Sequence, residues 1–172
     1  GGTLTLAGSY ANGNTLIIDS ATPSTLAFAG SANSVSAITI NNANQTLAVA
    51  TGGDLTIGTA ESITNGTISM QGGTLRDSGG LTIGSGGKLS GYGTVTADIA
   101  SGAGTVTASG GTLILSGNIS NGVNATIDSS TPSTLRFDGQ FITTSSITVN
   151  NANQTLAIGP GGDLWFKLAA GF

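Results

Sequence analysis

The sequence predicts an all-β protein whose 172 residues coil into a parallel β-helix, or β-solenoid, as a single elongated domain spanning residues 1–172. Three observations lead to this fold class: a long internal repeat, apolar residues at every second position, and glycine-rich corners in a chain with very few charges. A chain of this length can bury a sizeable core.

The internal repeat has no gap. Residues 1–55 recur at 110–164, an offset of 109 residues, and about 60% of the 55 aligned positions are identical. Self-similarity at a fixed period is typical of arrays in which each unit buries its apolar face against the next. The segment 56–109 completes the period, and 165–172 diverges from it. With coils of roughly 18–25 residues, one period would hold about five coils and the chain about eight.

Apolar and polar residues alternate through most of the chain. Successive side chains of a strand point to opposite faces, so Leu-x-Leu places two apolar groups inward and leaves Thr or Ser outward. We therefore expect short strands with buried apolar positions and little or no helix. In chain order, these positions are Leu4–Leu6, Leu16–Ile18, Leu26–Phe28, Ile38–Ile40, Leu47–Val49, Leu55–Ile57, Leu81–Ile83, Val95, Val106, Leu113–Leu115, Leu135–Phe137, Ile147–Val149 and Leu156–Ile158.

Glycine and proline mark the corners between the strands. Pro23 and Pro132 stand in the repeated segments Ala21–Thr25 and Ser130–Thr134, and a residue that cannot donate to a ladder is typical of a strand start. Charged residues make up only 7%, whereas open antiparallel edges are usually protected by Lys or Glu, so a solenoid is favoured over a sandwich. A Gly-Gly-x-Leu unit recurs at Gly1, Gly52, Gly72, Gly86, Gly110 and Gly161.

Composition excludes several classes of partner. The net charge is −4 with four Lys and Arg residues in all, too few to neutralise a track of phosphates, so we expect no nucleic-acid binding. No apolar run approaches 18 residues, so we expect no membrane insertion by this segment. Cysteine and histidine are absent, which removes thiolate chemistry and the commonest metal ligand.

The acidic residues form no unique catalytic pair. Asp19 and Asp128 are copies of each other across the repeat, as are Asp54 and Asp163, so they follow the period. A glycosidase needs two carboxylates at one cleft. We therefore expect a protein that is not an enzyme and has no catalytic residue, metal site or cofactor. A glycan-active β-helix enzyme is the alternative that the acids leave open.

Three stretches carry a family resemblance: LSGYGTVTADIASGAGTVTASGGTLILSG (Leu89–Gly117), GGDLTIG (Gly52–Gly58) and GGLTIGSGGKLSG (Gly79–Gly91). They resemble the β-strand repeats of autotransporter passengers and of giant repeat adhesins of Gram-negative bacteria. The resemblance implies a right-handed β-helix, export to the cell surface, and a structural or adhesive role with no catalytic motif. The implied partner is a host or biofilm surface glycan or protein.

Two groups of residues are candidate surface sites. One is an asparagine-rich motif present in both copies, which is either a glycan-binding amide cluster or a turn whose side chains bond the backbone. Its residues are Asn41, Asn42, Asn44, Asn150, Asn151 and Asn153. The other is the divergent tail 165–172, a candidate cap or assembly interface formed by Trp165, Phe166 and Phe172. Exposed end coils would let copies associate end to end, so a self-assembling extracellular filament is a further alternative.

Overall fold

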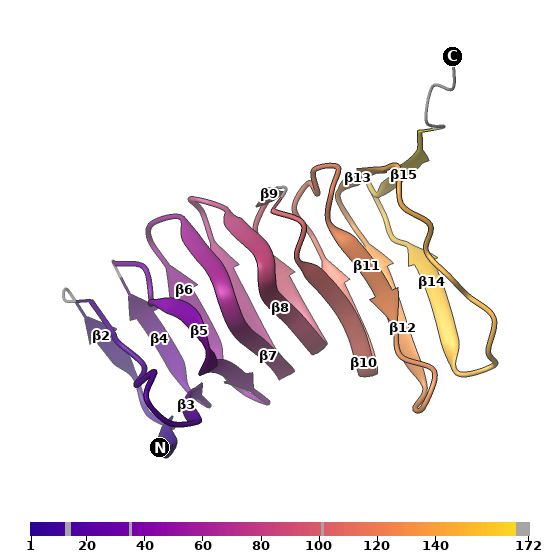
Figure 1. The fold of residues 1–172 in the computed structure, drawn as a ribbon. Helices are drawn as coiled ribbons and strands as arrows, with labels where there is room; N and C mark the ends of the chain where they lie inside the picture. The colour runs from indigo at the N-terminus through magenta and orange to yellow at the C-terminus, as the bar shows by residue number, and fades with distance from the viewer. Residues whose placement is uncertain (13–14, 35, 101, 168–172) are drawn as a thin grey trace.

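The computed structural model describes residues 1–12, 15–34, 36–100 and 102–167, and every regular element in these ranges is a β-strand. The coils stack into a β-solenoid of about eight turns, as the sequence predicts, and Figure 1 shows them side by side from one terminus to the other. The strands are β1 (Gly2–Leu6), β2 (Tyr10–Asn12), β3 (Ser24–Phe28), β4 (Ser31–Ser34), β5 (Ile40–Ala50), β6 (Asp54–Ile57), β7 (Glu61–Asp77), β8 (Leu81–Thr96), β9 (Ile99–Ala100), β10 (Thr105–Leu115), β11 (Asn124–Ile127), β12 (Ser133–Phe137), β13 (Gln140–Thr143), β14 (Gln154–Ile158) and β15 (Asp163–Phe166).

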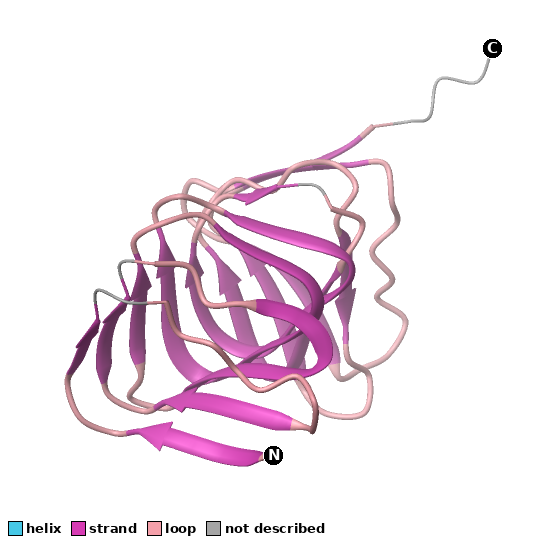
Figure 2. Cartoon of the chain, turned by 60° about the vertical axis from the view of Figure 1, so that its left-hand side comes forward, coloured by secondary structure: helices cyan, strands magenta, loops and turns pink. Residues whose placement is uncertain are grey.

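All strand pairings in the described ranges are parallel, because each coil returns the chain to the same face one level further along the rod. Partners on successive coils are 17 residues apart between Lys88 and Thr105 and 23 residues apart between Ala32 and Leu55. Figure 2, turned toward the N-terminal end, shows the strands wrapping around a common interior.

Three rows of inward-pointing residues, which we call ladders A, B and C, fill that interior. Strand alternation places every second side chain there, and each fully buried Leu or Ile contributes about 1.5–3 kcal/mol through the area it removes from water. Ladder A is Leu4, Leu26, Leu47, Ile68, Leu89, Val106 and Ala125. Ladder B is Tyr10, Ala32, Leu55, Leu75, Val95, Leu115, Phe137 and Ile158. Ladder C is Glu61, Leu81, Ile99, Ile119, Phe141 and Leu164.

The 109-residue period is not a whole number of coils. Ladder A takes five steps from Leu4 to Val106. The repeat equivalent of Leu4 is Leu113, which lies on the next face of the same coil, on the strand segment that supplies Leu115 to ladder B. The period therefore covers about five and one third coils, because the coils of the middle segment are short. Equivalent residues of the two copies consequently lie on different faces of the rod.

The end coils correct one expectation. Leu4, Val149 and Ile158 stand at alternating positions that the sequence predicts to be buried, yet they are 60%, 47% and 48% exposed. Each belongs to the first or last coil, which has a neighbour on one side only. In the interior coils the prediction is confirmed: Leu47, for example, is fully buried.

Candidate functional site

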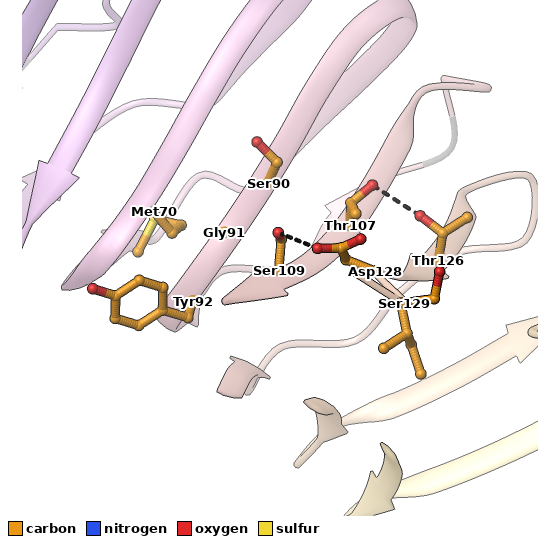
Figure 3. Close-up of a pocket in the computed structure, with 10 residues that line it drawn as sticks. Met70, Ser90, Gly91, Tyr92, Thr107, Ser109, Thr126, Asp128 and Ser129 are labelled. Carbon is orange, nitrogen blue, oxygen red and sulfur yellow. Dashed lines mark hydrogen bonds between the residues drawn. The ribbon is translucent and has the colours of Figure 1, made fainter. Parts of the chain in front are cut away.

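An open groove lies on the outer surface of ladder A, across four successive coils, and has a volume of about 600 Å³ (Figure 3). It forms where the coil is shortest and the two neighbouring strands turn their corner differently. Between its pairings with Gly91 and Gly93 of β8, strand β10 uses the four residues 109–112, whereas β8 uses Tyr92 alone. Strand β10 therefore bulges beside Tyr92 and forms a wall of the groove.

Glycines on both neighbouring coils make room for the Tyr92 ring. A Cβ atom added to Gly111 would lie 3.0 Å from Cγ of Tyr92, and one added to Gly72 would lie 3.0 Å from its Cε2. Gly72 and Gly110 also have φ angles of +96° and +74°, which favour glycine. The ring is thus held against main chain from the coil before and the coil after. It remains 37% exposed at one side of the groove.

Hydroxyl groups line the floor of the groove. Ser69, Ser90, Thr107 and Thr126 are register partners on four consecutive coils, so their side chains stand in a row about 4.8 Å apart on the outer face. The Thr107 and Thr126 hydroxyl oxygens are hydrogen-bonded to each other at 2.8 Å. Each hydroxyl can both donate and accept, so the row offers both functions to a ligand.

Asp128 closes the side of the groove opposite Tyr92 (Figure 3). Its carboxylate accepts hydrogen bonds from the main-chain N–H of Ser130 at 3.0 Å and from the hydroxyls of Ser109, Ser130 and Thr131. These donors, the Ser130 N–H first, lower the pKa of Asp128 to about 2, so the group is an anion at neutral pH. The groove therefore runs from an aromatic ring to a fixed negative charge.

The asparagine-rich motif lies elsewhere and bonds the backbone in both copies. The Nδ2 of Asn44 donates to the carbonyl of Ser20 at 3.0 Å, and the Nδ2 of Asn153 donates to the carbonyl of Ser129 at 3.0 Å. Asn42 and Asn151 accept from the main-chain N–H two residues ahead, each at 2.9 Å. Side chains used in this way support the turn interpretation.

The two copies of the motif do not meet. The first lies at the corner between ladders C and A and the second one corner further round, because the period adds about one third of a coil. Asn41 instead has Asn65 of the next coil as its register partner. The first copy also lies within strand β5, whereas Asn150 and Asn151 precede β14. The structure therefore does not bring the six asparagines into one surface.

A glutamine that the sequence analysis did not single out holds the motif together. The Nε2 of Gln45 donates to the carbonyl of Ile18 on the preceding coil at 2.5 Å, and its Oε1 accepts from the N–H groups of Asn41 and Asn42. Gln154 repeats the bond to the preceding coil, donating to Ile127 at 2.6 Å. Gln45 is 2% exposed, so three buried polar main-chain groups depend on one amide.

Two further acids are buried in the core. Glu61 stands in ladder C at a position where the next coils have Leu81 and Ile99, and Asp77 is the register partner of the buried Ile57. Both carboxylates accept main-chain N–H groups. Burial, with a smaller contribution from Asp77, raises the pKa of Glu61 to about 7, and burial also raises the pKa of Asp77.

The remaining acids are mostly engaged in the surface structure. Asp54 pairs with Arg76 and Asp138 with Arg136, at 3.0 and 2.6 Å between carboxylate and Nε. Asp98 accepts the main-chain N–H of Asn118. In the part of the chain that the structure describes, no three acidic side chains gather into a group that could hold a metal ion.

The divergent tail begins inside a strand. Trp165 and Phe166 lie in β15, which pairs with β13 in the register that β6 uses with β4, so the coil continues past the point where the repeat ends. Their side chains are 60% and 56% exposed. Phe172, the third aromatic predicted for an assembly interface, lies outside the described residues.

Sequence reasoning missed the groove because its parts are far apart in the chain. Tyr92 carries the one signal that was available: it is the only aromatic residue between Phe28 and Phe137, and it stands between two glycines. The bulge that opens the groove depends on the pairing of β10 with β8, which the sequence pattern does not display.

No family model, curated protein or solved structure matches the chain. Over the described ranges, the structure holds no helix of the length and apolar character that crossing a bilayer requires.

Proposed function

We propose that the chain is a structural and adhesive segment of a secreted or surface-exposed bacterial repeat protein, with no catalytic role of its own. The observation that carries this proposal is the uninterrupted stack of about eight coils, which presents long, polar, nearly uncharged faces on a rigid rod. Such quasi-one-dimensional architecture offers extended surface rather than a deep cleft.

The use of the acidic residues supports a non-catalytic role. Glu61 and Asp77 are buried and tied to main-chain N–H groups, and Asp19 and Asp128 hold the two copies of one turn through similar bonds. General acid–base catalysis needs carboxylates that face a substrate. These four instead stabilise the fold, and the sequence resemblance to repeat adhesins points in the same direction.

Microspheres coated with the folded chain test this function. We expect them to adhere to biofilm or to cultured epithelial cells more strongly than spheres coated with an unfolded variant such as Ile63→Asp. Equal adhesion of both preparations, or none above bare spheres, would overturn the adhesive role. A search for soluble products released from polysaccharides serves as the parallel test of the enzyme alternative.

A self-assembling filament is the second candidate, and the end coils favour it. Leu4 and Ile17 of the first coil are 60% and 77% exposed, and Ile158, Trp165 and Phe166 near the other end are between 48% and 60% exposed. Terminal coils also carry unpaired N–H and C=O groups that can template another strand. Contacts between opposite ends are heterologous, and such contacts build open filaments unless a rotation closes them.

A further inference from the structure

We propose that the groove between Tyr92 and Asp128 is a carbohydrate-binding site that takes a short, non-acidic oligosaccharide. This inference rests on the proposed adhesive function and names the surface and the ligand class that would serve it. Its basis is the combination of a held aromatic ring, a row of hydroxyls and an anionic carboxylate in one open groove.

The aromatic ring supplies the apolar part of the site. The C–H faces of pyranose rings stack on aromatic π faces, which are electron-rich. Tyr92 is suited to this because glycines of two neighbouring coils hold its ring in place while over a third of the residue stays exposed. A ring fixed before binding loses little conformational entropy on binding.

The hydroxyl row and Asp128 supply the polar part. Sugar hydroxyls both donate and accept, and they match Ser90, Thr107 and Thr126, which do the same. The carboxylate of Asp128 is a strong acceptor for a sugar hydroxyl, since its charge persists down to about pH 2. Several convergent polar groups around an apolar contact are typical of a ligand site.

Charge and shape restrict the ligand. The fixed anion of Asp128 and the net charge of −4 disfavour uronic acids and sialylated glycans. The lining residues come from four successive coils, which span about 14 Å at the spacing of parallel strands. The groove is therefore long enough for a chain of sugars and too open to retain a single one.

An NMR titration of the 172-residue chain tests the proposal. The probes are cellohexaose, maltohexaose and chitohexaose as non-acidic oligosaccharides, with hexagalacturonate as the acidic comparison. We expect at least one non-acidic probe to bind, with shifted amide signals confined to residues 90–92, 107–109 and 126–129. Failure of all three at millimolar concentration, shifts elsewhere, or preference for hexagalacturonate would overturn it.

Variants separate the site from the fold. Tyr92→Ala should weaken binding about tenfold or more, whereas Tyr92→Phe should keep most of it, since the ring is the contact. Trp165→Ala, which removes another exposed aromatic, should change nothing. If Tyr92→Ala does not fold, Thr107→Arg places a bulky group in the groove from an outward position and should abolish binding. Binding that survives in the folded variants contradicts the proposal.

The microsphere assay distinguishes this inference from the function on which it rests. Adhesion that is lost with Thr107→Arg supports both. Adhesion that persists with Thr107→Arg, together with no binding of the sugars, overturns the groove and leaves the adhesive role standing. Sugar binding without adhesion of the coated spheres retains the groove and overturns the adhesive role.

Discussion

The carboxylate of Asp77 accepts a hydrogen bond from the main-chain N–H of Glu61 at 2.9 Å, and both side chains are 2–3% exposed. Glu61 in turn reaches the preceding coil, where its Oε2 accepts the N–H of Ile38 at 2.7 Å. Two acids therefore link neighbouring coils from inside a core of aliphatic residues. Removing a carboxylate from water disfavours its charged form, so this corner makes stability depend on pH.

Stability should fall as the pH rises from about 4.5 to 7. Because the pKa of Glu61 is raised from 4.5 to about 7, the folded chain binds more protons than the unfolded chain in this window, and the free energy of unfolding decreases by about 3 kcal/mol across it. The raised pKa of Asp77 acts in the same direction. Urea denaturation at a series of pH values measures the slope.

The variant Glu61→Gln should remove most of that slope, because an amide does not titrate. Asp163→Asn removes an exposed carboxylate and should leave the slope in place. At lower pH the sign reverses: the lowered pKa values of Asp19 and Asp128 mean that stability is lost as these groups protonate in the folded state. A stability maximum between about pH 4 and 5 is the expected result, and a maximum above neutral pH would contradict it.

Charge introduced into an interior ladder should unfold the chain. Ile63 is fully buried between Ile40 and Ile83 on the coils before and after it, and Ile63→Asp would place an unpaired charge there at a cost of several kcal/mol. The neighbouring Thr64 is exposed, so Thr64→Asp should lower the melting temperature by only a few degrees. Equal losses at the two positions would mean that the strand presents its other face to the core.

The same substitution should cost more in the last coil's interior counterparts than in the last coil itself. Leu156 lies at the end of the rod and is only partly buried, whereas its repeat equivalent Leu47 is fully buried. Leu47→Asp should therefore be the more destabilising of the two. Thermal melts of both variants compare one chemical change in two environments that the repeat makes otherwise similar.

Truncating the buried glutamine should reveal its role in coil stacking. Gln45→Ala leaves the carbonyl of Ile18 and the N–H groups of Asn41 and Asn42 without their partner, at about 1–3 kcal/mol for each buried group. Gln154→Ala breaks the equivalent bonds in the last coil, where water can replace them, so it should cost less. Midpoints of urea denaturation give both values, and a larger loss for Gln154→Ala would contradict this account.

Alternation of apolar residues and the 109-residue repeat sufficed to predict the parallel coils, because both report local rules of strand geometry. Leu26, Leu47 and Leu89 fall into one buried row as their spacing indicates. The same rules could not place Glu61 in the core, since a charged residue is expected outside unless its partners are known. Those partners, Ile38 and Asp77, lie 23 and 16 residues away in the chain.

The one-third rotation between the copies was equally hidden. It arises from coils of unequal length, such as the short step from Lys88 to Thr105, which depends on how residues 109–112 bulge. The groove beside Tyr92 has the same origin. A repeat alone predicts which residues are equivalent, but the direction in which they face depends on the length of every intervening coil.

The last prediction concerns association through the end coils. Exposed apolar side chains and unpaired main-chain groups stand at both ends, and four Lys and Arg residues in the whole sequence give little electrostatic opposition. Sedimentation velocity should show an average mass that rises with concentration. Ile17→Lys combined with Trp165→Lys should shift the chain toward monomer, whereas Thr64→Lys, which adds charge in the middle of the rod, should not. A chain that stays monomeric throughout, or associates equally in all variants, would leave the stalk without self-assembly.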